Sequence, residues 1–104
     1  MASAAEFINE MNAKFNPAAA EGLDLVFQFN IEDADNYHLI VKDGACEVVQ
    51  GEAGDPNVTL IMNSETLQGI VNGDLDGMMA FMSGQLKVEG DMMLATKLGE
   101  LFPA

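Results

Sequence analysis

Apolar residues recur along this chain with two periods, and the order of these periods predicts its elements. Near the N-terminus they have the spacing of one helix face, at Phe7, Ile8, Met11 and Phe15. A second short helix is expected from Asn16 to Ala20, because Pro17 suits a first helical turn and Gly22 suits a stop.

Strict alternation of apolar and polar residues then predicts strands, each with one buried face. In the first strand that face comprises Leu23, Leu25, Phe27, Phe29 and Ile31. In the second it comprises Tyr37, Leu39 and Val41. Asp43-Gly44 favours a two-residue hairpin turn, since both residue types tolerate a positive φ, so residues 45–50 are expected to form the returning strand.

The second half of the chain predicts a strand, two helices, a short strand and a last helix. The strands lie at residues 58–62 and around Leu86 and Val88. Asn63 or Ser64 is expected to cap the first of these helices and Gly73 to end it. The next helix starts near residue 75, and the last has a stripe of Met93 or Leu94, Leu98, Leu101 and Phe102. This partial segregation of strands and helices indicates an α+β fold with a largely antiparallel sheet, in a single domain spanning residues 1–104.

The charge of the chain excludes several partners. It has 17 acidic residues against four lysines, no arginine, and a formal net charge of −13. Such a surface repels nucleic-acid phosphates, and it lacks the basic clusters that bind anionic membranes. We therefore expect no nucleic-acid partner and no stable membrane insertion. We interpret the acidity as keeping a protein with an apolar interior in solution; a basic protein partner and a high-salt cytoplasm remain alternatives.

Location is indicated by the absence of sorting signals. Cys46 is the single cysteine, so no intramolecular disulfide can form. The N-terminus lacks the basic and apolar regions of a signal peptide, and no apolar run is long enough to span a membrane. The last residues, LFPA, are not a Ser-Lys-Leu peroxisomal address. These features favour a cytoplasmic location.

Candidate catalytic and metal-binding residues are few. A pair of His38 and Cys46 across the hairpin is one interpretation, but a solvent-side or edge-strand histidine and a cysteine that acts as a small hydrophobic residue are the simpler one. Residues 72–77, NGDLDG, match the opening of a calcium loop, yet Ser83 stands where the loop needs a bidentate glutamate. We expect no catalytic residue, no metal, no cofactor and no enzymatic activity.

Methionine is the residue type that remains to be explained. Six of the eight gather in the second half of the chain, at Met62, Met78, Met79, Met82, Met92 and Met93. Methionine is flexible and polarizable, so a surface that it lines adapts to ligands of varied shape. Ordinary core packing is the alternative for any one of them.

The segment from Val58 to Phe102 resembles the sterol carrier protein (nonspecific lipid-transfer) domain family. The resemblance rests on TLIM at residues 59–62, the capped helix at 64–73, AFMSGQLKVEG at 80–90 and DMMLATKL at 91–98. FQFNI at 27–31 and VKDG at 41–44 agree more loosely.

This resemblance implies a five-stranded sheet with helices on one face, enclosing an apolar tunnel that takes a sterol, a fatty acyl chain, an acyl-CoA or a prenyl chain. Members of the family are non-catalytic carriers or modules of enzymes. The chain departs from the basic animal members in its acidity and in its last residues. By position, the tunnel lining would draw on Phe27, Phe29, Val71, Met78, Phe81, Met82, Leu94, Leu98, Leu101 and Phe102.

Two functions follow as hypotheses. The first is an intracellular lipid-binding or carrier domain with an apolar ligand. The second is an acidic protein-interaction domain, an accessory factor for example in quinone biosynthesis, in which exposed Met and Leu of the last helix form a homodimer or contact a basic partner. A third hypothesis is a chain that once bound lipid and now only packs its own core.

Overall fold

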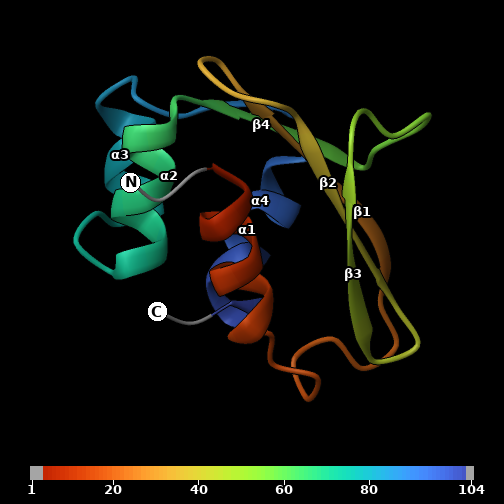
Figure 1. Cartoon of the computed structure of the whole chain (residues 1–104). Helices are drawn as coiled ribbons and strands as arrows, with labels where there is room; N and C mark the ends of the chain where they lie inside the picture. The colour runs from red at the N-terminus through yellow and green to blue at the C-terminus, as the bar shows by residue number, and fades with distance from the viewer. Residues whose placement is uncertain (1–3, 103–104) are drawn as a thin grey trace.

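The computed structural model describes residues 4–102 (Figure 1). Along the chain the elements are α1 (Ala4–Ala13), β1 (Asp24–Ile31), β2 (Tyr37–Lys42), β3 (Ala45–Gln50), β4 (Val58–Met62), α2 (Ser64–Asn72), α3 (Gly77–Met82), β5 (Lys87–Gly90) and α4 (Met92–Leu101).

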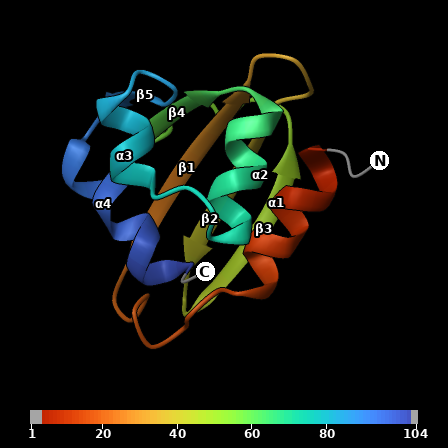
Figure 2. The same cartoon turned by 90° about the vertical axis from the view of Figure 1, so that its left-hand side faces the viewer.

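The strands form one five-stranded sheet in the order β3-β2-β1-β4-β5. The central pair, β1 and β4, is parallel, and the other neighbouring pairs are antiparallel. Figures 1 and 2 show the helices gathered on one side of this sheet. The predicted α+β fold, with a mostly antiparallel sheet and helices on one face, is therefore confirmed.

The strand register places the predicted apolar faces side by side. Phe27 lies opposite Leu39 on β2 and Val58 on β4, and all three side chains are buried. Phe29 lies opposite Leu60 on β4 in the same way. Because side chains alternate along a strand, this one face meets the helices and forms the core.

The other face of the sheet is partly covered by the chain between β3 and β4. Gln28 of β1 is only 3% exposed there. Its Nε2 donates to the Tyr37 carbonyl (3.3 Å) and its Oε1 accepts from the backbone N–H of Ala53 (2.7 Å). The side chain thus holds residues 51–53 across the outer face. Alternation alone predicts a polar outward position here, not a buried one.

Residues 17–22 are turns, so the predicted second helix was wrong. Ala20 N–H donates to the Pro17 carbonyl (3.1 Å) and Leu23 N–H to the Ala20 carbonyl (3.0 Å), which is the bonding pattern of four-residue β-turns. Gly22 has φ of 77°. Between Pro17 and this glycine there is room for little more than one helical turn, too short for helix propagation to offset nucleation.

Hairpin and cap chemistry is as the sequence predicts. Asp43 and Gly44 have φ of 55° and 75°, the paired positive values of a two-residue hairpin turn. Asn63 caps α2, its Oδ1 accepting from Thr66 N–H (2.8 Å), and Gly73 ends that helix in a left-handed conformation. Asp33, from the turn after β1, accepts the N–H (2.7 Å) and the hydroxyl (2.8 Å) of Ser64.

The segment that matches the start of a calcium loop serves α3 instead. Asp76 Oδ1 accepts from Met78 N–H (2.9 Å), which is N-cap geometry. The helix therefore begins at Gly77, two residues later than predicted, because the carboxylate of Asp76 is used as its cap.

Candidate ligand-binding cavity

A cavity of about 320 Å³ lies between the sheet and the helices. Its buried wall combines side chains from the two central strands with side chains from α2, namely Phe29, Leu60, Met62, Leu67 and Val71. The other sides come from α1, α3, α4 and β5. Elements from both halves of the sequence therefore build one largely apolar space.

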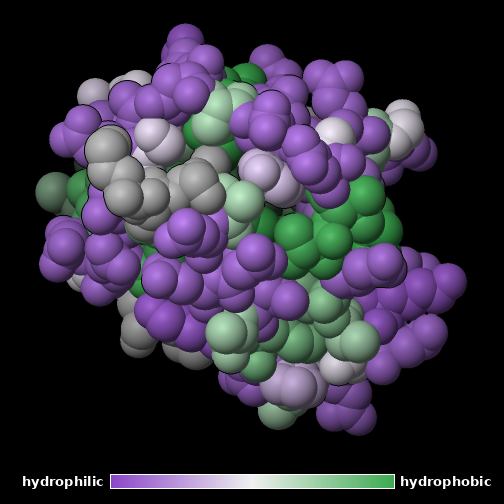
Figure 3. Space-filling model, in the orientation of Figure 1, coloured by the Kyte–Doolittle hydropathy of each residue, from purple (hydrophilic) through white to green (hydrophobic). Residues whose placement is uncertain are grey.

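The rim of the cavity carries exposed apolar side chains from two helices. Met78 and Phe81 of α3 are 53% and 38% exposed, and Met92 of α4 is 44% exposed. Ala80 is the buried residue of α3. On the face of the molecule in Figure 3, by contrast, hydrophilic residues predominate. The large exposed methionines lie on α3 and α4, and Met78 and Met92 among them also line the cavity.

Six of the ten side chains predicted to line a tunnel lie on the cavity wall: Phe29, Val71, Met78, Phe81, Leu98 and Phe102. The structure therefore brings together residues of β1, α2, α3 and α4 around one cavity. Ligand contact by these side chains, and continuation of the cavity as a tunnel, stay predictions.

The other four predicted residues lie off the cavity wall. Phe27 and Leu101 are fully buried members of the core and do not line the cavity. Met82, the last residue of α3, is 75% exposed and turns to solvent. Leu94 is half-buried against the core on a different side of α4.

The cavity-facing stripe of α4 contains residues that a search for large apolar side chains misses. Met92, Ala95, Thr96 and Gly99 follow one another at the three- and four-residue spacing of a single helix face. The small size of Ala95 and Gly99 leaves space in the cavity that leucines, such as those at positions 94 and 101, would fill. Small residues at this spacing, in a helix otherwise rich in Met and Leu, were the sequence signal that could have identified the cavity-facing side of α4. Sequence reasoning also missed Met11, Lys14, Leu60, Met62, Leu67, Ile70 and Val88.

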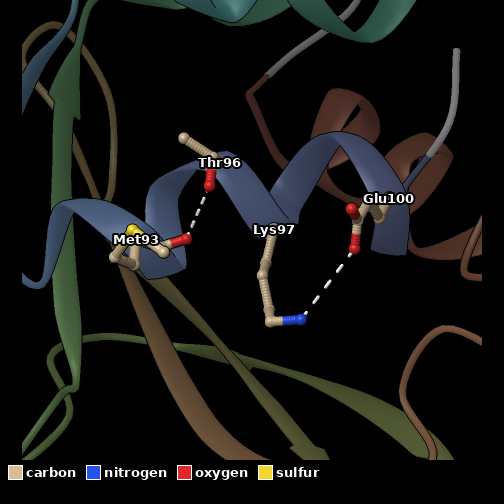
Figure 4. Close-up of polar contacts among 4 residues, drawn as sticks. All are labelled: Met93, Thr96, Lys97 and Glu100. Atoms are coloured by element: carbon tan, nitrogen blue, oxygen red, sulfur yellow. Dashed lines mark hydrogen bonds and ion pairs between the residues drawn. The ribbon is translucent and has the colours of Figure 1, made fainter.

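Three side chains supply the polar groups of the wall. Thr96 Oγ1 donates to the Met93 carbonyl (2.7 Å), which turns its hydrogen toward its own helix (Figure 4). Asp76 is engaged as the cap of α3. Lys14, directly after α1, donates from Nζ to the carbonyl of Val71 (2.8 Å) near the end of α2. The other lining residues that the structure describes are apolar or glycine.

Comparison with known proteins places this architecture in a family. The family model of the SCP-2 sterol transfer family matches residues 7–103, almost the whole chain. The chain belongs to the SCP-2 sterol transfer family. Peroxisomal multifunctional enzyme A of Dictyostelium discoideum is 37% identical over 92 residues, which cover 79% of this chain and 21% of that enzyme. The SCP-2 domain described here thus spans about a fifth of the length of that relative.

Two solved structures share the fold. Palmitated SCP2L2 from Aedes aegypti superposes with a TM-score of 0.74 at 27% identity, over 94% of this chain and 92% of that one. The sec-alkylsulfatase Pisa1 from Pseudomonas sp. gives a TM-score of 0.87 at 21% identity, over 99% of this chain and 17% of that one. The second likeness shows the fold alone.

His38 and Cys46 are not arranged as a catalytic pair in this SCP-2 domain. Cys46 lies opposite Val41 in the β2–β3 ladder, whereas His38 lies opposite Val49, three positions away. His38 Nδ1 is 3.1 Å from the Gly51 carbonyl oxygen. Burial raises the pKa of the Cys46 thiol to about 11, so the thiol is protonated at neutral pH and a poor nucleophile.

None of the helices within residues 4–102 has the length and apolar content needed to cross a membrane. Within the same range, no three or more His, Cys, Asp or Glu side chains are grouped as metal ligands.

Proposed function

We propose that this SCP-2 domain is a non-catalytic lipid carrier that holds one apolar chain in the cavity between its sheet and helices. The observation that carries this proposal is the apolar cavity of about 320 Å³. Its size lies within the range of about 300–1,000 Å³ that is usual for small-molecule sites. The palmitated relative with the same fold supports a lipid as the ligand class.

The energetics of such a site favour broad specificity. Each methylene that leaves water gains about 0.8 kcal/mol, or roughly fourfold in affinity, until the cavity is full. Methionines at the rim, such as Met78 and Met92, change rotamer at low cost and can follow ligands of different shape. A sterol, a fatty acyl chain, an acyl-CoA and a prenyl chain all fit this description, and the carrier would act in the cytoplasm without a cofactor.

A fluorescent fatty acid titrated into the purified protein tests the proposal. We expect saturable binding of one probe per chain, displaced by unlabelled palmitate. Ala95→Phe fills the cavity from α4 and should abolish saturation. Met93→Phe adds an aromatic ring to the same helix at a position that is 75% exposed and off the cavity wall, so it should bind as the wild type does. Failure of acyl, sterol and prenyl probes to bind competitively would reject the carrier function.

A second function is favoured by methionines that serve neither core nor cavity. Met79, Met82 and Met93 are 61%, 75% and 75% exposed. Such side chains suit a contact with a second copy or with a basic protein, as in an interaction domain. Leu101 cannot take part because it is fully buried. Light scattering of the wild type and of Met82→Gln with Met93→Gln tests this: an interaction domain requires a larger assembly that the double variant loses.

A further inference from the structure

Among the described residues that line the cavity, Lys14 carries the one cationic group, its ammonium. The protein has only four lysines and no arginine, against 17 acidic residues. A cation is therefore unusual anywhere on this molecule, and its position at an apolar ligand-sized space calls for an explanation.

The position of this ammonium is fixed by two helices. Helices α1 and α2 lie side by side in Figure 2 and are in contact. Lys14 follows the last residue of α1, and its Nζ donates to the carbonyl of Val71 in the last turn of α2 (2.8 Å). The carbonyl end of a helix favours a positive charge. Val71 also lines the cavity, so the ammonium is held at the cavity edge.

The ammonium has unused hydrogen-bonding capacity. A lysine ammonium carries three donors, and the Val71 carbonyl takes one of them. Within residues 4–102, the ion pair found joins Lys97 to Glu100 (3.9 Å), so Lys14 has no carboxylate partner in this range (Figure 4 shows the Lys97 pair). In contrast, Asp76 and Thr96 already bond to backbone groups of their own helices.

We propose that Lys14 is the specificity-determining residue of the cavity and binds the carboxylate of a single-chain fatty acid, with the alkyl chain running along the apolar wall. This inference rests on the proposed carrier function. A protein with a net charge of −13 repels anions at long range, so a local cation is needed to hold an anionic head group. Charge-assisted hydrogen bonds of this kind are the strong ones. Neutral sterols and prenyl alcohols gain nothing from it.

Lys14 could instead serve only to tie α1 to α2. The two roles differ in how a substitution affects ligands of equal chain length. A tie between helices supports the cavity as a whole, so its loss weakens every ligand alike. A carboxylate anchor affects the acid and leaves the alcohol unchanged.

The test compares hexadecanoate with 1-hexadecanol on the full chain, by displacement of a fluorescent fatty acid. Lys14→Met should weaken hexadecanoate by about tenfold while hexadecanol stays within about twofold. Lys14→Arg should retain the affinity for the acid. Lys97→Met removes the same charge away from the cavity wall, and should leave both affinities unchanged.

Equal weakening of acid and alcohol by Lys14→Met, or no change in either, would overturn the proposal while the carrier function stands. If the wild type binds neither ligand, the carrier function itself fails. A readout on the wild type covers the case in which Lys14→Met does not fold. The carboxyl carbon of bound 13C-labelled hexadecanoate should titrate below its pKa in water next to an ammonium; a raised or unchanged pKa contradicts the anchor.

Discussion

Ala95 and Gly99 lie one turn apart on α4, and both line the cavity. Ala95 carries only a methyl group and Gly99 has no side chain, so this face of the helix occupies little of the cavity, which Leu60 and Val71 also line. The volume available to a ligand thus depends on the absence of bulky side chains at positions 95 and 99 of α4 as much as on the apolar residues of this helix.

Substitution of Gly99 separates helix stability from cavity volume. A Cβ at this position meets nothing within 4 Å, so Gly99→Ala should raise the melting temperature by about 2–8 °C through higher helix propensity. Gly99→Leu should also fold but should weaken binding of long-chain ligands by about tenfold, because the leucine side chain narrows the cavity beside α4. Calorimetry and ligand titration measure the two effects. If Gly99→Leu leaves the ligand affinity unchanged, bound ligands do not contact the side of α4 that carries Gly99.

Gln28 should control stability without controlling binding. Gln28→Leu removes the acceptor of the Ala53 N–H, which lies in the segment between β3 and β4. The free energy of unfolding, measured by urea denaturation, should fall by about 1–3 kcal/mol. Ligand affinity should be unchanged, because Gln28 lies on the face of the sheet away from the cavity. Gln50→Leu is the control: Gln50 is exposed and donates only to Asp35, so its effect should stay below about 0.5 kcal/mol.

Asp33 should contribute an acid-dependent part of the stability. The hydrogen bonds from the hydroxyl and then the N–H of Ser64 lower the pKa of Asp33 below its usual 3.8. A lowered folded-state pKa gives stability that is present above that usual value and lost as the pH falls through the lowered one. Wild type should therefore be more stable than Asp33→Asn at pH 6, and the difference should shrink in urea melts below pH 4. A gap that is constant with pH contradicts this linkage.

The Cys46 thiol should react slowly with iodoacetamide at neutral pH. Burial raises its pKa from 9.0 to about 11, so its alkylation rate in the folded protein should keep rising up to about pH 11. The protein unfolded in urea provides the control, with a midpoint near 9. Because the raised folded-state pKa disfavours the thiolate, this group stabilises the fold below pH 9 and loses that contribution as the pH rises toward 11. A folded-state midpoint at or below 9 would contradict the burial argument.

Elements controlled by local sequence were predictable. Alternation gave the buried faces of β1, β2 and β4, and local turn and cap chemistry gave the Asp43-Gly44 hairpin, the Asn63 cap and the Gly73 stop. These signals lie within a few residues of the structure that they determine. The helix expected from Asn16 to Ala20 was wrong, because the residues that favour its start and its stop are separated by too few residues to form a helix.

Features that depend on distant segments were predictable only in part. Large apolar residues such as Phe29 and Leu98 were named as lining and lie on the cavity wall, while their contact with a ligand stays a prediction. Ala95 and Gly99 were missed, because a space between helices depends on small residues as well as large ones. The burial of Gln28 was missed for a related reason. Its cover comes from residues 51–53, and no periodicity within β1 reports a loop that crosses from elsewhere.

The parallel pairing of β1 and β4 makes the cavity a property of the whole fold. Phe29 and Leu60 are neighbours in its buried wall but come from different halves of the chain. Contacts of such sequence separation require loop closure and form late relative to hairpins. A fragment that contains only residues 58–102 would carry most of the family sequence pattern and still lack the part of this wall that β1 supplies. Ligand binding is consequently coupled to global folding, so a bound lipid should slow hydrogen exchange in the first strand as well as in the helices that touch it.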